Sequence, residues 1–579
     1  MEKIWRYPTP DPKQVREVQR AVACHEMIAK ILVNRGIYPA SRLTAFLSEA
    51  LDQIQDPFSF KDMERAVRRT AHAIMDHEKI LIFGDYDADG ITSIVILKEF
   101  LSQCGVEAKS YIPHRMDEGY GMKAHHIERF LENKPAPSLI ITVDCGISSM
   151  DAATKAKESG IDLIITDHHT PLEQIPDALA VVNPKQPECQ SGLSHLAGVG
   201  VTFYFLLALR KFLREASFFK GRKEPNMKKM CDMVAIGTVA DMVPLTGENR
   251  LLVKIGLGVL KQSERAGVRA LLTLSGATAE SLSAEDIAFR IAPRLNSAGR
   301  MEHAQAALDL LLETDETRAL SRAKEIEACN TARKEMETRI FEQVESYMEN
   351  HPEETARSII LASNYWHLGV LGIVCSRLSN KYFKPAILVS LDADKGTGSG
   401  RSVPGVNLFN ALSRCREELI QFGGHQMATG LTIEPEKIPS FKARFDQVLE
   451  EVLSTAPLFP SILIDVAIDF EDITESLIDQ IEMLKPFGEN NPEPLFSTGH
   501  IQIVNGGTVG NGHRRFTLAQ KNGRSDKKMN AICFRSSVPS LSERDRFDEI
   551  AYTIKWNRWN GRKTVQLVIV DFKKTPCNL

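Results

Sequence analysis

Short apolar runs alternate with amphipathic stretches between residues 79 and 183, and this alternation is the clearest pattern in the chain. The apolar runs cover residues 80–83, 139–143, 161–165 and 180–182. Between them lie stretches of helical spacing at residues 91–103, 124–132 and 150–159. Strands that alternate with helices are typical of βαβ units, so the pattern predicts a parallel sheet covered by helices. Residues 203–213 and 230–240 then predict buried helices.

Residues 315–349 predict one long polar helix, because they contain neither Gly nor Pro and keep a narrow apolar stripe. We expect this helix to bridge two domains; its stripe comprises Leu320, Ala323, Ile326, Met336, Ile340, Val344 and Tyr347. A second α/β pattern follows, with strands expected at residues 358–361 and 386–389. From Pro457 onward, β-rich runs alternate with Gly and Asn turns and predict a small β-barrel; the runs are residues 462–470, 500–504, 515–519, 530–534, 549–554 and 564–570.

The first 75 residues look helical, with apolar residues at helical spacing in residues 15–31 and again from Ser41. At 579 residues the chain is too long for a single hydrophobic core. We therefore expect a helical region, a first α/β domain, a connecting helix, a second α/β domain and a barrel, at residues 1–75, 76–305, 306–350, 351–456 and 457–579.

Composition excludes several classes of protein. No apolar stretch approaches the ~20 residues that a membrane span needs, and the start of the chain has no apolar signal-peptide core. The 10 cysteines are scattered without a Cys-x-x-Cys pair, which argues against a zinc knuckle and a disulfide framework. We therefore expect a protein of the reducing cytoplasm. The net charge of −4 gives no overall sign of a polyanion partner, so a nucleic-acid site would have to be locally basic.

Three carboxylates gather in the motif GDYDADG at residues 84–90. Asp85, Asp87 and Asp89 alternate along the chain, so an extended strand end would project them to the same side. Like charges this close destabilise one another unless a cation lies between them. A solvated turn or a calcium-binding helix-loop-helix is the alternative, but a strand precedes the motif and no Glu follows at the spacing that a calcium loop needs.

Three further groups follow the carboxyl ends of predicted elements; they are Asp144 after residues 139–143, Asp167-His168-His169 after residues 161–165, and Asp241 after residues 233–239. Each has an ordinary interpretation when taken alone, as a helix cap or a structural histidine. Because ligands bind at the carboxyl edge of an open parallel sheet, the groups together predict one metal site. Mixed carboxylate and imidazole ligands favour Mn²⁺ over an all-oxygen Mg²⁺ or Ca²⁺ cage, and their number suits two ions that share a carboxylate.

Two glycine-rich segments would let the backbone approach a phosphate group. They are GGHQMATG at residues 423–430, which contains His425, and the loop expected for KGTGSGRS at residues 395–402. On composition alone each is equally a flexible turn. The nearby arginines are equally members of surface ion pairs; they are Arg294, Arg300, Arg377 and Arg401.

These motifs carry a family resemblance. GDYDADG, the Asp144 strand end, the Asp-His-His triplet and VADMVPL at residues 239–245 are similar to the successive motifs of the Asp-His-His (DHH) phosphoesterase superfamily. GGHQMATG resembles its companion DHHA1 domain. Three later segments resemble the RecJ family of single-strand-specific exonucleases; they are APRLNSAGRM at residues 292–301, WHLGVLGIVCSR at 366–377 and KPFGENNPEPLF at 485–496. The chain departs from the family pattern at Cys375, where Ala is expected, and at Asn490, where Gly is expected.

The resemblance implies an α/β fold with a parallel-sheet DHH domain and a second α/β DHHA1 domain, joined by a long helix and followed by an OB-like β-barrel. It implies hydrolysis of single-stranded DNA from the 5′ end to mononucleotides, in DNA repair and recombination, with two divalent ions, Mn²⁺ or Mg²⁺. The implied metal ligands are Asp85, Asp87, Asp89, Asp144, His168 and Asp241. Asp85, His168 and His169 would serve catalysis. The residues implied to hold the DNA strand are His169, Asn296, Arg300, Arg377, Ser399, Arg401 and His425.

The same resemblance implies a monomeric clamp, with a helicase and a single-strand-binding protein as partners. In the barrel, aromatic and basic side chains would contact the strand, although the aromatic ones equally form barrel cores; they are Phe516, Trp556, Trp559, Arg514, Arg515, Arg558 and Lys563.

Two rival functions stay open at this point. The first is a DHH-family phosphodiesterase of short oligonucleotides or cyclic dinucleotides, and the barrel from residue 457 argues against it because those chains are shorter and lack it. Inorganic pyrophosphatase is disfavoured for the same reason. The second is a non-catalytic single-strand-binding protein, which would have lost metal ligands, whereas every ligand position is filled here.

Overall fold

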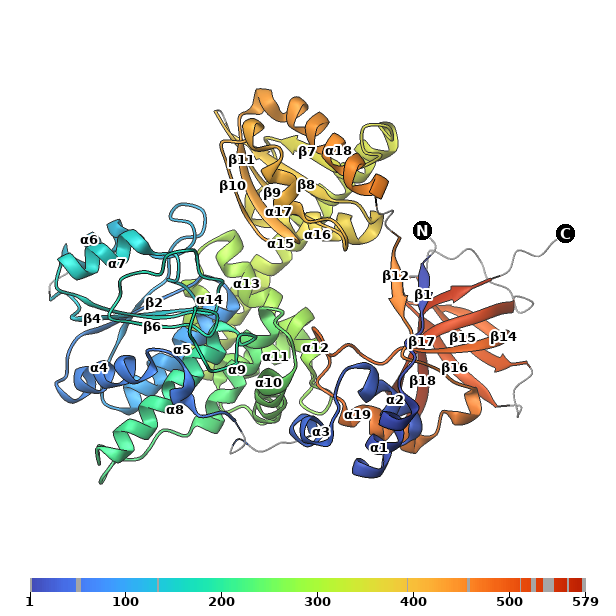
Figure 1. The fold of residues 1–579 in the computed structure, drawn as a ribbon, viewed down its shortest axis with the longest axis horizontal. Helices are drawn as coiled ribbons and strands as arrows, with labels where there is room; N and C mark the ends of the chain where they lie inside the picture. Colours follow the sequence, from blue (N-terminus) through green and yellow to red (C-terminus); the bar gives the residue numbers. More distant parts are fainter. Residues whose placement is uncertain are drawn as a thin grey trace.

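The computed structural model describes residues 3–47, 51, 54–132, 135–392, 394–455, 459–510, 512–521, 527–534, 546–559 and 562–574. Figure 1 shows a first sheet with its helices on the left, a second sheet at the top and a barrel on the right, with the N-terminus beside the barrel. Among the helices within these residues, none combines the length and the hydropathy that a bilayer crossing requires.

The first sheet is parallel and has 5 strands in the order β3-β2-β4-β5-β6. Its strands are β2 (Ile80–Gly84), β3 (Lys109–Tyr111), β4 (Leu139–Val143), β5 (Asp162–Thr166) and β6 (Ala180–Val182). The carboxyl ends of β2, β4 and β5 therefore meet at one edge, as the apolar runs predicted. The sequence pattern missed β3, because this short edge strand has no apolar run.

Helices cover both faces of this sheet, which explains why its central strands are apolar throughout. Ile80 and Ile82 of β2 pack into one core, and Leu81 and Phe83 pack into another on the opposite face. The first core lies against α4 (Met63–Met75), α5 (Ala88–Gln103), α8 (Gly198–Glu215) and α9 (Met227–Ala240). The second lies against α6 (Ala124–Glu132) and α7 (Met150–Glu158). The expected α/β sheet with buried helices is thus confirmed.

A single long helix, α15 (Glu316–Asn350), joins the first core to the second sheet. It follows the helices α10 (Gly247–Leu260), α11 (Ala266–Ser275), α12 (Ala284–Asp286), α13 (Ala292–Met301) and α14 (Gln305–Leu312). Ala323 near its start packs in the first core, whereas Ile340 packs in the core of the second α/β unit. Its 35 residues span about 50 Å, so it connects the two units as predicted. One member of the predicted stripe is misplaced, because Leu320 is exposed and Ala319 is buried instead.

The second sheet has the strand order β10-β11-β9-β8-β7. Its strands are β7 (Ile359–Ser363), β8 (Ala386–Leu391), β9 (Gly396–Arg401), β10 (Gln421–Gly424) and β11 (Ala428–Ile433), with helices α16 (Leu368–Tyr382), α17 (Leu408–Ser413) and α18 (Ile438–Thr455). The prediction of a glycine-rich loop at residues 395–402 is wrong, because this segment forms β9 between β8 and β11. Glycine is needed in this strand because neighbouring side chains pack closely on it; a Cβ at Gly400, for example, would lie 2.8 Å from Oγ1 of Thr429.

The carboxyl-terminal strands form the predicted barrel. They are β13 (Val466–Ala467), β14 (Phe496–Val509), β15 (His513–Gln520), β16 (Lys528–Cys533), β17 (Arg546–Trp559) and β18 (Arg562–Lys573). The strand order is β13-β14-β15-β16-β18-β17, and pairing of β14 with β17 closes the barrel. The strand β12 (Ser461–Leu463) stays outside it and pairs in parallel with β1 (Ile4–Arg6).

The N-terminal segment packs on this barrel and not on the first sheet. Its helices are α1 (Pro12–Val22), α2 (Glu26–Asn34) and α3 (Ala40–Leu47), and they share a core with α19 (Glu475–Met483) and the barrel strands. The expectation that residues 1–75 are helical misses β1 and a break at Ala23, whose left-handed φ of 49° ends α1. The fully buried Arg250 ties α10 to this unit, because its Nη2 donates to the carbonyl oxygens of Met483 (3.1 Å) and Lys485 (2.8 Å).

Candidate metal centre

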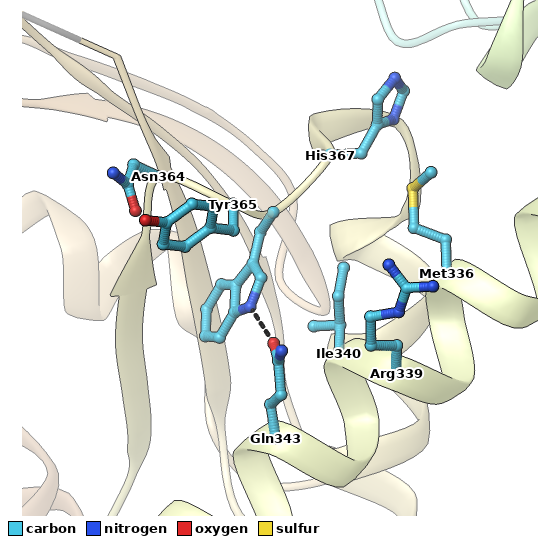
Figure 2. Close-up of a pocket in the computed structure, with 8 residues that line it drawn as sticks. Met336, Arg339, Ile340, Gln343, Asn364, Tyr365 and His367 are labelled. Atoms are coloured by element: carbon cyan, nitrogen blue, oxygen red, sulfur yellow. Dashed lines mark hydrogen bonds between the residues drawn. The ribbon is translucent and has the colours of Figure 1, made fainter.

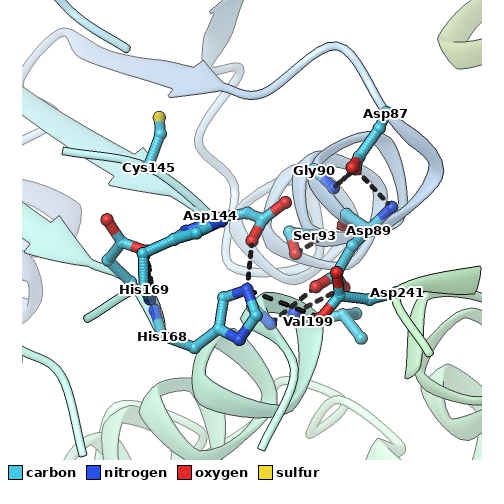
Figure 3. A network of polar contacts seen from close by, with 12 residues as sticks. Asp87, Asp89, Gly90, Ser93, Asp144, Cys145, His168, His169, Val199 and Asp241 are labelled. Atoms are coloured by element: carbon cyan, nitrogen blue, oxygen red, sulfur yellow. Dashed lines mark hydrogen bonds and ion pairs between the residues drawn. The ribbon is translucent and has the colours of Figure 1, made fainter. Parts of the chain in front are cut away.

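Polar side chains from four segments meet at the carboxyl edge of the first sheet (Figure 3). Potential ligand atoms lie within 4.8 Å of one another in overlapping groups, which are Asp85 with Asp87 and Asp144, Asp144 with His168 and His169, and Asp89 with His168 and Asp241. Asp144 and His168 each belong to two groups, so the groups form one cluster. The structure therefore brings together every residue that the sequence suggested as a metal ligand.

The acid motif after β2 is shaped by the start of α5. Oδ1 of Asp87 accepts hydrogen bonds from the backbone N–H groups of Asp89 (2.9 Å) and Gly90 (3.1 Å), so Asp87 caps this helix. A Cβ at Gly90 would lie 2.5 Å from the carbonyl oxygen of Asp85, so only glycine fits there. The turn thus presents alternate carboxylates at the sheet edge.

Asp144 is held in an unusual backbone conformation directly after β4. Its φ is 59°, in the left-handed region that few residues other than glycine adopt. Gly198 at the start of α8 packs so closely that a Cβ there would lie 2.2 Å from Oδ1 of Asp144. Strained backbone of this kind is often found at functional sites. Here it directs the carboxylate toward His168, whose Nε2 lies 3.2 Å from Oδ1.

His168 is neutral and presents one ring nitrogen to the cluster. Its Nδ1 lies 3.1 Å from the carbonyl oxygen of Leu196, and only a protonated nitrogen can donate to a carbonyl. Nε2 is therefore the basic nitrogen, and it faces Asp144 and Oδ2 of Asp241 (3.6 Å). Burial, helped by the neighbouring His169, lowers the pKa of His168 to about 3. This is the form of histidine that binds a metal ion.

The carboxylates of the cluster are electrostatically unfavourable without a cation. Burial, followed by the charges of neighbouring carboxylates, raises the pKa of Asp85, Asp144 and Asp241 well above the usual range and that of Asp89 to about 7. Oδ1 of Asp85 and Asp144, Oδ2 of Asp241 and Nε2 of His168 are buried without a hydrogen-bond partner among the described residues. Buried polar atoms normally have partners. Divalent cations would satisfy these atoms, and the donor set of carboxylates and imidazole fits Mn²⁺ or Mg²⁺.

Asp89 is oriented by a helix that begins far away in the sequence. Its Oδ2 accepts from the N–H of Gly198 (2.7 Å) and its Oδ1 from the N–H of Val199 (2.9 Å), both in the first turn of α8. These two hydrogen bonds restrict the orientation of the Asp89 carboxylate and favour its charged form. The sequence gives little indication of this role of α8. Its only local sign is the pair of glycines, Gly198 and Gly200, in an otherwise apolar run.

His169 is held by two partners beside the cluster. Its Nδ1 lies 2.8 Å from Oδ1 of Asp167 and 2.9 Å from the hydroxyl of Tyr120. Burial alone would lower the pKa of His169, but the hydrogen bond and charge of Asp167 outweigh it and raise the pKa to about 9. The hydrogen bond to Asp167 therefore favours the protonated form of His169. Tyr120 was missed in the sequence, where nothing distinguishes it from other loop tyrosines.

Basic groups from three elements lie near the acid cluster. Arg300 on α13 donates to the carbonyl oxygen of Gly369 (3.0 Å), and Arg401 on β9 donates to Oγ of Ser399 (3.2 Å). Burial, then the charge of Arg115 and others, lowers the pKa of Arg300 to about 10, and Arg115 also contributes to the lowered pKa of Arg401. Arg115 itself stacks on Tyr86 of the acid motif at 4.9 Å. Mutual repulsion among these guanidinium groups indicates a site for an anion.

The other residues expected to hold DNA lie in different surroundings. Oδ1 of Asn296 accepts the N–H of Ala88 at 2.7 Å, so Asn296 supports the acid motif. Arg377 lies at the contact of α15 with α16, 3.6 Å from Glu337 and with its Cζ 3.8 Å above the ring of Phe341. His425 occupies the exposed turn between β10 and β11, next to the end of β9.

The barrel residues differ in exposure. Phe516 is buried in the barrel core, which excludes it from stacking on bases. Trp556 is half-buried, donates to Asp479 (3.2 Å) and carries Nζ of Lys563 3.7 Å above its ring. Arg514 and Arg515 lie on β15. The side chains of Arg558 and Trp559 lie outside the described residues.

A further cluster of possible ligands does not qualify as a metal site. Glu118, His125 and His126 lie within 4.8 Å of one another. Nδ1 of His126 accepts the N–H of Lys123 at 2.9 Å, so the proton is on Nε2, which faces Glu118 at 3.6 Å. A protonated Nε2 cannot coordinate an ion, so His126 does not serve as a ligand and the hydrogen bond from Lys123 gives it a structural role.

Comparison with known proteins decides the family. The sequence matches that of the single-stranded-DNA-specific exonuclease RecJ of Bacillus subtilis with 36% identity over 576 residues, which is 98% of this chain and 70% of that protein. This chain belongs to the RecJ family. The Escherichia coli RecJ is 32% identical over 94% of this chain and 95% of its own length. Sequence profiles match at residues 79–238 (DHH family, N-terminal domain), 356–451 (DHHA1 domain) and 464–571 (RecJ OB domain).

Solved RecJ structures agree in fold and contain metal ions. RecJ of Thermus thermophilus, crystallised with Mn²⁺, superposes with a TM-score of 0.82 at 29% identity, over 99% of this chain and 80% of that one. The same protein was also solved with Mg²⁺. A RecJ exonuclease bound to manganese covers 68% of this chain and 95% of its own length, with a TM-score of 0.57 and 35% identity. These ions are the ones that the donor set of the acid cluster fits.

Proposed function

We propose that this RecJ-family chain is a metal-dependent exonuclease that hydrolyses single-stranded DNA from its 5′ end to mononucleotides. The observation that carries the proposal is the buried set of acid and imidazole atoms without hydrogen-bond partners at the edge of the first sheet. Relatives with this sequence pattern are named single-stranded-DNA-specific exonucleases, which supports the substrate class. Both rival functions are disfavoured, because the barrel is present and no predicted ligand is lost.

The residues that would hold two divalent ions are Asp85, Asp87, Asp89, Asp144, His168 and Asp241. Such ions supply polarisation of the phosphoryl group and a lowered pKa for water. The chain itself prepares the ligands: amides of α8 orient Asp89, and the carbonyl oxygen of Leu196 sets the tautomer of His168. Asp85 either completes the ligand set or supports it.

His169 is the proposed phosphate-binding histidine. Asp167 and Tyr120 both engage its Nδ1, so Nε2 is left to donate to a phosphate oxygen. The carboxylate of Asp167, 2.8 Å from Nδ1, favours the protonated ring. A cation at this position would stabilise negative charge that develops on the phosphate in the transition state.

The basic cluster offers an explanation for the direction of hydrolysis. Arg300, Ser399 and Arg401, joined by Arg115, would bind a terminal 5′ phosphate near the metal centre, because guanidinium groups favour paired hydrogen bonds to phosphate. Release of mononucleotides requires that one nucleotide lie between this cluster and the ions. Asn296 acts indirectly by holding the acid motif.

Other parts of the proposal concern the wider DNA surface and the cell. Arg377 and His425 would contact the strand beyond the terminal nucleotide. The proposed domains are residues 1–75, 76–305, 306–350, 351–456 and 457–579, with α4 at the end of the first region packed on the first sheet. A monomer in the cytoplasm, working in repair and recombination with a helicase and a single-strand-binding protein, completes the proposal.

A digestion assay with labelled DNA tests the activity, its direction and its strand choice together. Single strands labelled at the 5′ end should release labelled mononucleotide at once in Mn²⁺, whereas 3′-labelled strands should release it only after the strand is consumed. Chelation should stop both reactions. A blunt duplex is wider than one strand, with a major groove of about 12 Å alone, and should be resistant. Equal digestion of duplex, or early release of the 3′ label, would refute the proposal.

A further inference from the structure

A groove of about 450 Å³ lies between α15 and the loop that joins β7 to α16, outside the metal centre and the basic cluster (Figure 2). One wall is a stripe of α15 formed by Met336, Arg339, Ile340 and Gln343, which are spaced i, i+3, i+4 and i+7 and so share a face. The other wall is the loop, with Tyr365 and Trp366. This volume falls in the range of small-ligand sites.

The loop wall is fixed in place. The indole Nε1 of Trp366 donates to Oε1 of Gln343 at 2.8 Å, across the groove, and Oγ of Ser390 donates to the carbonyl oxygen of Trp366 at 2.6 Å. The N–H of Tyr365 donates to Oγ of Ser363 at 3.2 Å. Yet the side chain of Tyr365 is 88% exposed, next to the buried Trp366. The loop therefore presents one aromatic face to solvent at a defined position.

The groove also contains a guanidinium group and a side-chain amide that have no interaction partner in the described part of the chain. Arg339 is exposed and has no hydrogen bond or ion pair with any residue in the described part of the chain. The same is true of the side-chain amide of Asn364 beside Tyr365. By contrast, the guanidinium group of Arg377 on α16 lies 3.6 Å from the carboxylate of Glu337 on α15 and so has an ion-pair partner. A flat aromatic face, a free guanidinium and a free amide on an apolar floor match a nucleotide.

The groove adjoins the basic cluster through both of its walls. His367 follows the loop and caps α16, and the carbonyl oxygen of Gly369 in the first turn of that helix accepts from Arg300. On α15, the charge of Arg333 acts on Arg300, and Arg339 lies about 9 Å further along the helix. A strand that reaches the cluster can therefore continue along α15.

We propose that this groove is a subsite for an internal nucleotide of the single-stranded substrate, with a base stacked on Tyr365 and a backbone phosphate paired with Arg339. The inference rests on the proposed function and adds to it a site away from the reacting phosphate. Stacking on an aromatic ring tolerates every base, because each base has a π face. The subsite would therefore strengthen binding of longer strands without adding sequence preference.

Binding to oligonucleotides with one abasic nucleotide tests the stacking. The strands carry a 5′ phosphate, and the abasic position is moved stepwise from that end. Binding is measured by fluorescence anisotropy in chelator, so the readout does not depend on hydrolysis. The unaltered protein should lose affinity at one internal position by on the order of tenfold, and Tyr365→Ala should remove that position-specific loss. Tyr365→Phe keeps the aromatic ring, so this variant should again show the position-specific loss of affinity.

The kinetics of hydrolysis distinguish a role in this subsite from a role in the catalytic centre. Tyr365→Ala and Arg339→Ala should raise KM for a 20-nucleotide strand and leave kcat/KM for a 5′-phosphorylated dinucleotide unchanged. Lys324→Ala removes an exposed cation elsewhere on α15 and should change neither. An abasic profile that is the same in Tyr365→Ala and the unaltered protein, or an equal loss on the dinucleotide, would overturn the subsite. Failure of the unaltered protein to cleave any single strand would instead overturn the proposed function, and the binding profile would still decide the groove.

Discussion

Asp144 is buried, has a left-handed backbone conformation and packs closely against Gly198. Burial and repulsion from the neighbouring carboxylates disfavour its charged form. Asp144→Asn removes that charge at constant shape. Hydrolysis should fall at least a hundredfold, while the metal-free protein should unfold at an equal or higher temperature, because buried like-charge repulsion is relieved. Activity assays and thermal unfolding in chelator measure the two effects.

Metal addition provides the control for Asp144→Asn. Ions that bind only the folded state raise the unfolding temperature of the unaltered protein. That rise should shrink or vanish in the variant. A variant with a full metal-induced rise and substantial kcat would show that Asp144 is no ligand.

His126 gives a pH dependence that is separate from the metal centre. Burial, then the charge of His125, lowers its pKa to about 4, against an unfolded value of 6.5; Lys123 and Arg129 act in the same direction and Glu118 opposes them. At pH values between about 4 and 6.5, the unfolded chain therefore binds a proton at His126 that the folded chain does not bind. Stability from this residue is present above pH 6.5 and is lost as the pH falls toward 4.

His126→Gln keeps a hydrogen-bond acceptor but does not titrate. Urea unfolding in chelator at several pH values from 7 to 5 should show a flatter decline for the variant, by up to about 1 kcal/mol per pH unit. Parallel declines in the two proteins would mean that His126 titrates alike in folded and unfolded chains.

At the scale of elements, β9 and α16 are packed together around the basic cluster. A Cβ at Gly372 on α16 would lie 2.9 Å from Nη2 of Arg401 and 3.0 Å from Oγ of Ser399, so the glycine lets the helix approach these side chains. The strand conformation of β9 points Ser399 and Arg401 to the same side. Two neighbouring elements thus define the geometry of the proposed phosphate site.

Arg401→Ala should raise KM for 5′-phosphorylated single strands on the order of tenfold, because a charge-assisted pair of hydrogen bonds to phosphate is lost. The loss should be smaller for strands with a 5′ hydroxyl. Arg401→Lys should recover little, since an ammonium group cannot make the paired contact. Steady-state kinetics on both strands measure the difference. Equal effects on the two strands would place Arg401 away from the terminal phosphate.

At the scale of the whole molecule, the two ends of the chain form one unit. β1 pairs with β12, and Val18 and Ile28 share a core with Leu477 and the barrel. Removal of the barrel alone would therefore expose the apolar faces of α1 and α2. A fragment that lacks both ends keeps the metal centre, the basic cluster and the groove, but loses this shared core.

The fragment 57–455 should retain metal-dependent hydrolysis of short single strands and should bind long strands more weakly. The fragment 1–455 should aggregate or unfold at a lower temperature, because its N-terminal helices lack their partner. Light scattering, thermal unfolding and binding at one fixed salt concentration separate these outcomes. Unchanged affinity of 57–455 for long strands would show that the barrel does not hold DNA.

Local sequence patterns determined much of this protein. The apolar runs placed β2, β4, β5 and β6 to within one or two residues, and the acid motifs at their ends predicted that these carboxylates and imidazoles lie together. Both succeed for one physical reason: neighbouring parallel strands end at a common edge, so side chains at strand ends must meet there. The long helix and the barrel also follow from period and turn residues.

Other features were decided only by tertiary packing. The amides of α8 reach Asp89 across more than 100 residues of sequence, and Arg115, Arg300 and Arg401 come from separate elements. The segment 396–401 is a strand because neighbouring side chains fill the space above its glycines, which composition alone interprets as a loop. The N-terminal helices pack on the barrel because their apolar faces find its core there. Periodicity encodes which face of an element is buried, and only the assembled fold decides what that face is buried against.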